Sequence, residues 1–199
     1  MASDEKKTTD KPLTWQETLV QYLHDWVFLL SGVLIVFLLV FRVIVVSGSS
    51  MYSTLWDGDY LLLQSNVFYH EPQAGDVVVI SKESFDHGAP IVKRVIATEG
   101  QLVDIDFENG IVYVDGTALR EDYINNLTTN EEGMHFPLTV DDNCIFVLGD
   151  NRQNSKDSRH PSIGLVDKRE VLGKALFLMI PGTSHGEYPR DWRRIGAIE

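Results

Sequence analysis

The stretch from Trp26 to Val46 constrains the fold most, because it is almost entirely apolar and carries one charged residue, Arg42. About 20 helical residues are needed to cross the roughly 30 Å hydrocarbon core of a bilayer. An arginine near the end of such a helix can extend its charge to the lipid headgroups. The apolar region of a secretory signal peptide is shorter, at about 7–15 residues. We therefore predict one transmembrane helix over residues 26–46.

The positive charges around this span lie mainly on its N-terminal side. Three lysines precede it, Lys6, Lys7 and Lys11, whereas the first lysine or arginine after Arg42 is Lys82. Loops on the cytoplasmic side of a membrane carry the excess of lysine and arginine. We therefore expect a single-pass protein of the plasma membrane, with residues 1–25 in the cytoplasm and the chain after the span outside it. Residues 1–11 are polar and charged, which is typical of disorder.

A helix signal begins before the span. Thr14 and Glu17 fit a capping box, in which each side chain bonds the backbone N–H of the other residue. Residues suited to the headgroup layer then recur at helical spacing on one face, at Trp15, Leu19, Tyr22 and Trp26. This pattern predicts an interfacial helix within residues 1–25. The alternative is one longer helix that continues into the span.

Composition excludes several kinds of site. The chain has 29 acidic and 17 basic residues, a net charge of -12, which is the wrong sign for a surface that binds nucleic acid phosphates. Its single cysteine, Cys144, cannot form an intrachain disulfide or a thiolate zinc site. Cys144 lies in an apolar run, where packing is its expected role. The sequence predicts neither a metal site nor a cofactor, and no nucleic acid partner.

Beyond the span, apolar residues recur in short runs separated by turn residues, the pattern of β-strands. The predicted strands are Tyr60–Gln64, Asp76–Ser81, Pro90–Thr98, Leu102–Phe107, Ile111–Val114, Cys144–Leu148 and Gly173–Ile180. Asn109-Gly110 predicts a two-residue hairpin turn, and the polar residues 117–141 are expected to leave the core. We predict a mainly β fold, a compact antiparallel sheet or barrel over residues 47–199, preceded by a single N-terminal transmembrane helix.

Three segments of this β domain have possible chemistry, and the first begins at Ser47. Its serine and glycine residues are typical of a flexible linker, but the apolar Met51, Leu55 and Trp56 follow at once. Ser50 lies four residues beyond the predicted span, a distance of at most about 14 Å. We therefore expect Ser50 close to the membrane, with the three apolar side chains forming a rim in the lipid headgroups.

The second segment, Pro90–Ile96, places Lys93 beside Arg94 in a predicted strand. The period of two residues puts the two side chains on opposite faces. On an edge strand both could keep their charges in solvent. If Lys93 is instead buried among aliphatic side chains, burial lowers the pKa of its ammonium group, and the neutral amine can act as a general base.

The third segment, Gly149–His160, directly follows a predicted strand. It mixes charged side chains of both signs with side chains that form hydrogen bonds. A solvated loop fits this composition, and so does an interlocked network of aspartate and arginine.

Together the three segments resemble the bacterial type I signal peptidases, Ser/Lys endopeptidases that remove signal peptides from exported proteins. The letters S-M-Y-S-T-L that begin at Ser50 are similar to the family's S-M-x-P-T-L box, and the pair at Lys93 is similar to its K-R pair. The letters that begin at Gly149 match the family's G-D-N-x-x-x-S-x-D-S-R box at every defined position. The segments also occur in the family's order.

The resemblance implies that Ser50 is the nucleophile and Lys93 the general base. It also implies that Ser155 supports the lysine and that three charged residues hold the site together, Asp150, Asp157 and Arg159. Ser53 departs from the family pattern at the usual proline, so this turn is less fixed in advance. Gly48 stands where some members have a serine whose hydroxyl helps the oxyanion hole. The backbone N–H of Ser50 is then the one oxyanion donor that the sequence identifies.

The implied function is removal of signal peptides from exported preproteins by a membrane-anchored serine peptidase without a cofactor. Its expected partners are preprotein signal peptides and membrane lipid. Two alternatives remain open. One is a related Ser/Lys protease with a dedicated substrate, and the other is a non-enzymatic, single-span module whose acidic β domain binds an extracellular partner.

Overall fold

The computed structural model describes residues 14–183 and 189–198. It divides into an N-terminal unit, which ends at Leu38, and a C-terminal unit, Leu39–Glu199. The predicted disorder of residues 1–11 and the three lysines used to orient the span lie outside the described residues.

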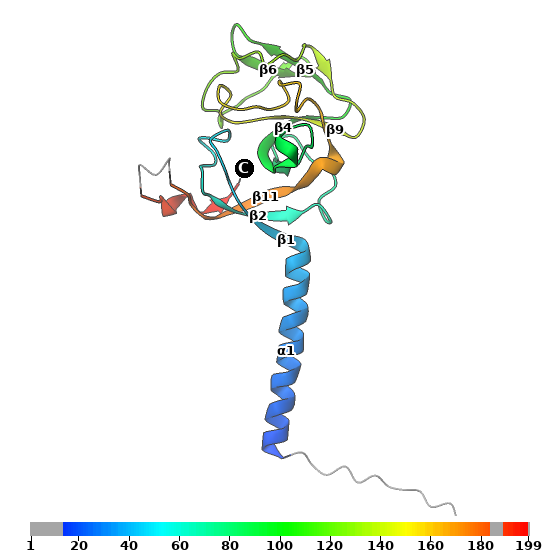
Figure 1. Ribbon diagram of the computed structural model, residues 1–199, viewed down its shortest axis with the longest axis vertical. Helices are drawn as coiled ribbons and strands as arrows, with labels where there is room; N and C mark the ends of the chain where they lie inside the picture. Colours follow the sequence, from blue (N-terminus) through cyan, green and yellow to red (C-terminus); the bar gives the residue numbers. More distant parts are fainter. Residues whose placement is uncertain (1–13, 184–188, 199) are drawn as a thin grey trace, which may run out of the picture. The chain divides into compact units, whose positions relative to one another are not determined.

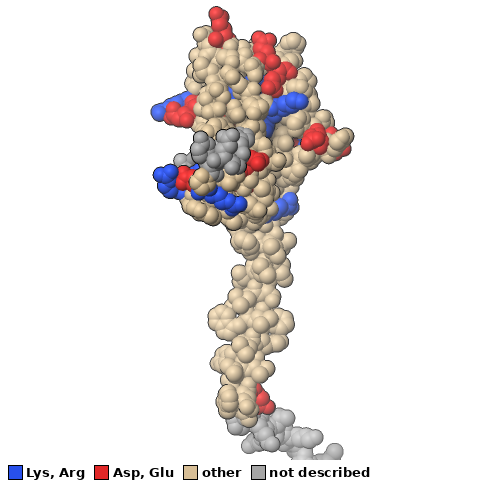
Figure 2. Space-filling view, turned by 60° about the vertical axis from the view of Figure 1, so that its left-hand side comes forward, with Lys and Arg blue, Asp and Glu red and all other residues tan. Residues whose placement is uncertain are grey.

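The N-terminal unit contains helix α1, Trp15–Val40, except for its last two residues. Its predicted capping box is confirmed: the Thr14 backbone N–H donates to Glu17 Oε2 at 2.8 Å, and the Glu17 backbone N–H donates to Thr14 Oγ1 at 3.4 Å. No residue of α1 is buried, and Figure 2 shows its described part without lysine or arginine. Within the described residues, α1 is the one helix long and apolar enough to cross a membrane. Helix α1 is continuous, so the structure contains one longer helix and not a separate interfacial helix.

The helix ends at Val40 and not at the predicted Val46, because Phe41–Val45 form strand β1. Along its whole length, β1 pairs antiparallel with β2, Tyr60–Ser65. The β-branched residues at the end of β1 favour this extended conformation. Hydropathy alone could not reveal the change, since the chain stays apolar across it.

The C-terminal unit is built on an antiparallel sheet with the strand order β1-β2-β11-β3-β4-β9-β10, and β12 pairs with β11 (Figure 1). The further strands are β3 Val77–Ile80, β4 Ile91–Thr98, β9 Cys144–Leu148, β10 Val166–Asp167, β11 Val171–Ile180 and β12 Gly196–Ala197. Register shifts in β4 and β11 bend these strands, as β-bulges do. The mainly β prediction is confirmed, and the sheet is curled.

A second, smaller sheet has the order β7-β6-β5-β8. Its strands are β5 Leu102–Asp106, β6 Ile111–Val114, β7 Thr117–Ala118 and β8 Leu138–Thr139. Three short 3₁₀ helices complete the described structure, at Asp86–Gly88, Lys168–Glu170 and Trp192–Arg194. Every strand predicted from sequence is present, whereas two-residue strands such as β7 and β8 are too short to leave a periodic pattern.

Strands β5 and β6 form the predicted hairpin, but the expected two-residue turn is wrong. The register pairs Asp106 with Ile111, so residues 107–110 form the loop. A two-residue type I′ turn requires positive φ at both central residues, and here Gly110 has one, at 70°, while Asn109 does not. The Asp106 carboxylate holds the wider loop by accepting hydrogen bonds from Asn109 N at 3.0 Å and Asn109 Nδ2 at 2.7 Å.

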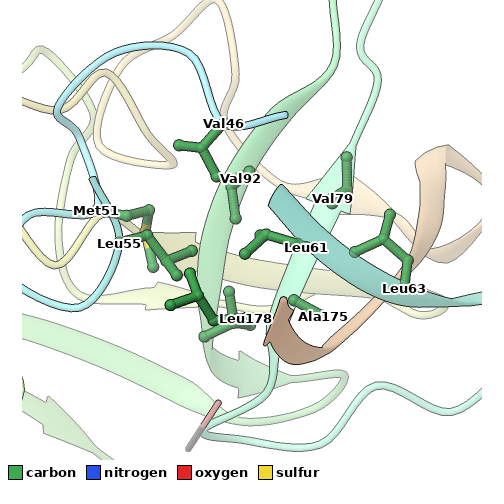
Figure 3. Packing of buried hydrophobic residues seen from close by; sticks show 10 residues of the cluster. Val46, Met51, Leu55, Leu61, Leu63, Val79, Val92, Ala175 and Leu178 are labelled. Carbon is green, nitrogen blue, oxygen red and sulfur yellow. The ribbon is translucent and has the colours of Figure 1, made fainter. Parts of the chain in front are cut away.

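Met51 and Leu55 lie in the hydrophobic core of the main sheet, each only 1 % exposed (Figure 3). The Leu55 N–H donates to the Met51 carbonyl at 2.8 Å, a helical-turn bond that directs both side chains to the same side. The expectation that they form a rim in the headgroups is therefore wrong. They instead anchor the turn after Ser50 to the sheet. Protein core and lipid both select apolar residues, so the sequence could not separate the two environments.

Candidate active site

Ser50 and Lys93 lie in direct contact. The Lys93 Nζ donates hydrogen bonds to Ser50 Oγ at 2.8 Å and to the carbonyl oxygen of Val92 at 2.9 Å. Ser50 begins the turn that Met51 anchors to the core, and Lys93 extends from the interior strand β4. The fold thus brings a hydroxyl and an amine into hydrogen-bond distance from two distant parts of the sequence.

The Lys93 side chain is buried, with 2 % of the residue exposed. Burial lowers the pKa of Lys93 from its ordinary value of 10.5 to about 8, because a buried site disfavours the ammonium form. The carboxylates of Asp157, Asp150 and Glu132 act in the opposite direction, and Arg159 adds to the lowering. A pKa of about 8 leaves about one lysine in ten neutral at pH 7.

Arg94 is also only 2 % exposed, so the alternative of an edge strand with both cations in solvent is excluded. Strand β4 lies between β3 and β9, and both of its faces are covered. Arg94 Nε and Nη2 donate to the two carboxylate oxygens of Asp150 at 2.9 and 2.8 Å. Its guanidinium also lies 4.0 Å above the ring of Tyr123. The two adjacent basic residues therefore have different environments. Arg94 is paired with a carboxylate, whereas burial favours the neutral form of Lys93.

The third segment is an interlocked network and not a solvated loop. Asp157 accepts hydrogen bonds from Arg159 Nε at 2.8 Å, from Arg159 Nη2 at 2.9 Å and from the backbone N–H of Gly149 at 3.0 Å. Asp150 accepts a further bond from Thr54 Oγ1 at 2.5 Å. Asp150, Asp157 and Arg159 are fully buried. These bonds fix the segment beside the turn that carries Ser50.

Ser155 lies in the third segment, where its side chain is buried, and it makes no hydrogen bond to Lys93. Its buried Oγ has no hydrogen-bond partner among the described residues. Gly149 allows this close packing, because a Cβ at this position would lie 2.1 Å from Ser155 Oγ and 2.6 Å from the carbonyl oxygen of Ser50. The Ser50 carbonyl also accepts from the backbone N–H of Asn151 at 3.0 Å. The glycine is therefore needed for the third segment to approach the backbone of Ser50.

The polar residues 117–141 were expected to leave the core, but part of this segment packs against buried residues. Arg152, which is fully buried, donates to Glu121 Oε2 at 3.1 Å and to Thr128 Oγ1 at 2.6 Å. Asn126 Nδ2 donates to Asn151 Oδ1 at 3.2 Å. The excursion therefore packs on the third segment and shields its ion pairs from solvent.

The C-terminal segment supplies contacts that sequence reasoning missed. Arg194 donates to both carboxylate oxygens of the buried Asp59, at 2.9 and 2.7 Å, and to the Thr54 carbonyl at 3.2 Å. Its guanidinium lies 4.1 Å above the ring of Trp56. The turn after Ser50 is thus held at Thr54 from two sides, by Asp150 and by Arg194. No local pattern signals a pairing across this separation in sequence.

A pocket of about 250 Å³ opens beside the Ser50–Lys93 pair. Its other lining residues are Ser47, Gly48, Ser49, Phe85, Ile91, Asn154 and Lys156. The Ser49 hydroxyl accepts a hydrogen bond from Asn154 Nδ2 at 2.9 Å. Among the described residues, no group of three or more His, Cys, Asp or Glu side chains could hold a metal ion. The arrangement offers acid–base and nucleophilic chemistry from side chains alone.

Comparisons with known proteins point to one family. The family model described as signal peptidase, peptidase S26, matches residues 19–180. The probable signal peptidase I-1 of Synechocystis sp. is 36 % identical over 150 residues, covering 71 % of this chain and 72 % of that protein. Signal peptidase I T of Bacillus subtilis is 31 % identical over 188 residues, covering 89 % and 95 %. A crystal structure of a signal peptidase I from Enterococcus faecalis, with 30 % sequence identity, covers 52 % of this chain and 96 % of its own at a TM-score of 0.44.

Proposed function

The chain belongs to the signal peptidase family, peptidase S26, and we propose that Ser50 is its nucleophile and Lys93 its general base. As a member, it is a membrane-anchored serine peptidase that removes signal peptides from preproteins. The family decides against a non-enzymatic binding module. The observation that carries the assignment of roles is the 2.8 Å contact between Lys93 Nζ and Ser50 Oγ at a buried lysine.

Acylation follows from the chemistry of these two groups. A serine hydroxyl is a weak nucleophile until a base accepts its proton, and a neutral lysine can serve in place of histidine. Neutral Lys93 accepts the proton of Ser50 Oγ, and the oxygen attacks the carbonyl carbon that ends the signal peptide. The carbon–nitrogen bond then breaks, and the Lys93 ammonium gives its proton to the departing amine of the mature protein.

Deacylation uses the same base. Lys93 is neutral again once the amine has left, and it accepts a proton from the water that attacks the acyl-enzyme. The ester bond to Ser50 Oγ then breaks, and the Lys93 ammonium returns its proton to Ser50. The second N–H of the amine remains directed at the Val92 carbonyl, at 2.9 Å in the resting enzyme. This bond supports the proposal, because it restricts rotation of the Lys93 amine. The restriction favours orientations in which the nitrogen lone pair points toward Ser50.

We assign the backbone N–H of Ser50 as the hydrogen-bond donor that stabilises the oxyanion of the tetrahedral intermediate. Gly48 has no hydroxyl to contribute, and its backbone N–H donates to Asp57 Oδ1 at 2.7 Å. The Ser49 hydroxyl is bonded by Asn154. Preorganised donors of this kind act where negative charge develops, in a site with little water.

The supporting roles are assigned to residues of the third segment. Asp150 joins Arg94 to Thr54, and Asp157 with Arg159 fixes the backbone at Gly149. None of these three residues forms a hydrogen bond with Ser50 or Lys93 in the described part of the chain, so they act by positioning the two segments and through their charges on Lys93. Ser155 is assigned to the lysine because its buried hydroxyl has no hydrogen-bond partner among the described residues and packs at Gly149, as the Ser50 carbonyl does; this hydroxyl is then available to the amine when Ser50 carries the acyl group.

We assign the N-terminus to the cytoplasm and the β domain to the outer side of the plasma membrane. The lysine-rich N-terminal residues support this orientation, because Arg42 in β1 is the one lysine or arginine that follows α1 before Lys82. Because the helix ends at Val40, the transmembrane segment is assigned to α1, Trp15–Val40, and the peptidase domain begins at β1.

Membrane lipid is assigned to an exposed apolar face of the main sheet. The strand registers pair Val45 with Tyr60 and Tyr60 with Ile180, and all three side chains are at least 36 % exposed. A neighbouring row pairs Val43 with Leu62 and Leu62 with Phe177. An exposed apolar patch on a membrane-anchored protein is suited to the headgroup boundary.

The assignment of lipid to this patch is tested by the substitutions Tyr60→Ser and Ile180→Ser. They should weaken activity measured with lipid vesicles, and unchanged activity with vesicles would contradict the assignment.

The nucleophile is tested by Ser50→Ala in the full-length, detergent-solubilised protein. Cleavage of a preprotein, identified by N-terminal sequencing of its product, should be lost, while thermal unfolding stays close to that of the wild type. Ser49→Ala is the matched control, and we expect it to retain cleavage. Near-normal turnover by Ser50→Ala would show that the nucleophile has been assigned wrongly.

A further inference from the structure

Lys156 is a cation at the catalytic pocket that forms no ion pair within 4.0 Å in the described part of the chain. It lines the same pocket as Ser50 and Lys93, and it is exposed. No ion pair involving Lys156 forms among residues 14–183 and 189–198. Most other described cations of the β domain are paired, as Lys82 is with Glu170 at 3.1 Å.

The charge around this pocket differs from that of the chain as a whole. The net charge of the protein is -12, yet the pocket is lined by two lysines and by no aspartate or glutamate. Lys93 is held toward the neutral form by burial. Lys156 is therefore the main source of positive potential where the substrate enters. Its solvent-exposed ammonium leaves room for a carboxylate from another chain.

We propose that Lys156 forms a subsite for an acidic side chain of the preprotein close to the scissile bond. This rests on the proposed function, in which Ser50 marks where the scissile bond lies. A carboxylate there would pair with Lys156, so a preprotein with aspartate or glutamate at that position is cleaved faster than its amide counterpart. Exposed ion pairs of this kind change a rate constant by about 2- to 5-fold.

Lys156 is not among the charged groups that act most strongly on the pKa of Lys93. The charged groups that act on Lys93 are Asp157, Asp150, Glu132 and Arg159. Lys156 instead acts on Glu132, where it opposes the effect of burial on the pKa of that carboxyl. Glu132 lies 3.9 Å from Arg159 Nη2 and is largely buried, so it leaves Lys156 available.

The test uses peptides that span a signal peptide cleavage site, with one Glu or Gln placed in turn at the three positions on each side. Each residue of an extended peptide advances about 3.3 Å, so the set covers about 20 Å around Ser50. The measured quantity is the ratio of kcat/KM for the Glu and Gln peptides, with the full-length protein in neutral detergent at low salt. We expect a ratio of about 2–5 at one or more positions for the wild type, near one for Lys156→Gln, and below one for Lys156→Glu.

The matched control is Arg120→Gln, since Arg120 is an exposed cation that does not line the pocket, and this variant should keep the wild-type ratio. A wild-type ratio near one at every position would overturn the proposal, as would a preference for Glu that survives in Lys156→Gln. A loss in Lys156→Gln that is equal for all peptides and appears only with anionic phosphatidylglycerol vesicles would also overturn it, because Lys156 would then bind lipid headgroups. Cleavage of the neutral parent peptide, compared with Ser50→Ala, reports separately on the proposed function.

Discussion

Arg94 and Asp150 form a buried, bidentate ion pair that joins the strand of Lys93 to the turn after Ser50. The two Arg94–Asp150 hydrogen bonds measure 2.9 and 2.8 Å, and both side chains are at most 2 % exposed. Arg94 directly follows Lys93 on β4, and Asp150 also bonds the Thr54 hydroxyl. The pair therefore fixes the distance between Lys93 and Ser50 through the backbone of each.

Replacing Asp150 by asparagine should destabilise the protein strongly. Arg94 would keep its charge in a buried site without a counter-charge, and such a loss costs about 3–5 kcal/mol. For a chain of this size the midpoint of thermal unfolding should fall by about 6–20 °C. Arg94→Lys should cost less and retain cleavage, because a cation remains beside Asp150. An Asp150→Asn protein as stable as the wild type would contradict this account of the ion pair.

Replacing Lys93 by methionine should make the protein inactive but more stable. The pKa of Lys93 is about 8 in the folded protein and about 10.5 when exposed, so the unfolded chain binds more protons between these values, and wild-type stability rises with pH in that window. Below pH 8 the buried ammonium costs the fold about 3 kcal/mol. Lys93→Met should therefore unfold at a higher temperature than the wild type at pH 7, by a margin that shrinks toward pH 10. A lower unfolding temperature at pH 7 would show that Lys93 is well solvated.

Replacing Gly149 by alanine should reduce cleavage at least about 100-fold, since a displacement of about 1 Å at a reacting group has an effect of this size. The new Cβ would lie 2.6 Å from the Ser50 carbonyl oxygen, which is backbone and cannot rotate away. Gly196→Ala is the matched control, because a Cβ at Gly196 meets no atom within 4 Å. If kcat of Gly149→Ala stays within a few-fold of the wild type, the third segment does not set the position of Ser50.

Replacing Arg194 by alanine should lower kcat more than it raises KM. The change removes both bonds to Asp59 and the bond to the Thr54 carbonyl, so the turn after Ser50 loses one of its two fixed points. A cost of about 2 kcal/mol for the buried Asp59 predicts a fall of about 4–8 °C in the unfolding midpoint. Lysine cannot reproduce the planar fork and should restore activity only in part.

The control for Arg194 is its neighbour Arg193, whose side chain is 91 % exposed and pairs with Asp191. Arg193→Ala should leave cleavage unchanged. Equal effects of the two substitutions would mean that the C-terminal segment acts through its net charge and not by holding the turn.

The sequence predicted the parts of this fold in which period and turn chemistry act locally. The interior strands, the capping box at Thr14 and the existence of the hairpin all follow from such patterns. It failed where one residue type serves two environments: Met51 and Leu55 were expected in lipid and lie in the core, and β1 was expected in the helix. The close approach of Ser50 and Lys93 came from the family resemblance, since their own patterns left a linker and an edge strand open. Arg194 was missed because its partners are distant in sequence.

The central claim is that neutral Lys93 removes the proton from Ser50, and the pH dependence of kcat/KM for a preprotein peptide tests it most directly. The acidic limb of the wild-type profile should have an apparent pKa of about 8, the value for Lys93 in the folded enzyme. Arginine stays protonated and cannot accept a proton, so Lys93→Arg should be inactive throughout the range from about pH 6 to 10. Substantial hydrolysis by Lys93→Arg, or a wild-type profile that is flat across that range, would contradict the Ser/Lys mechanism.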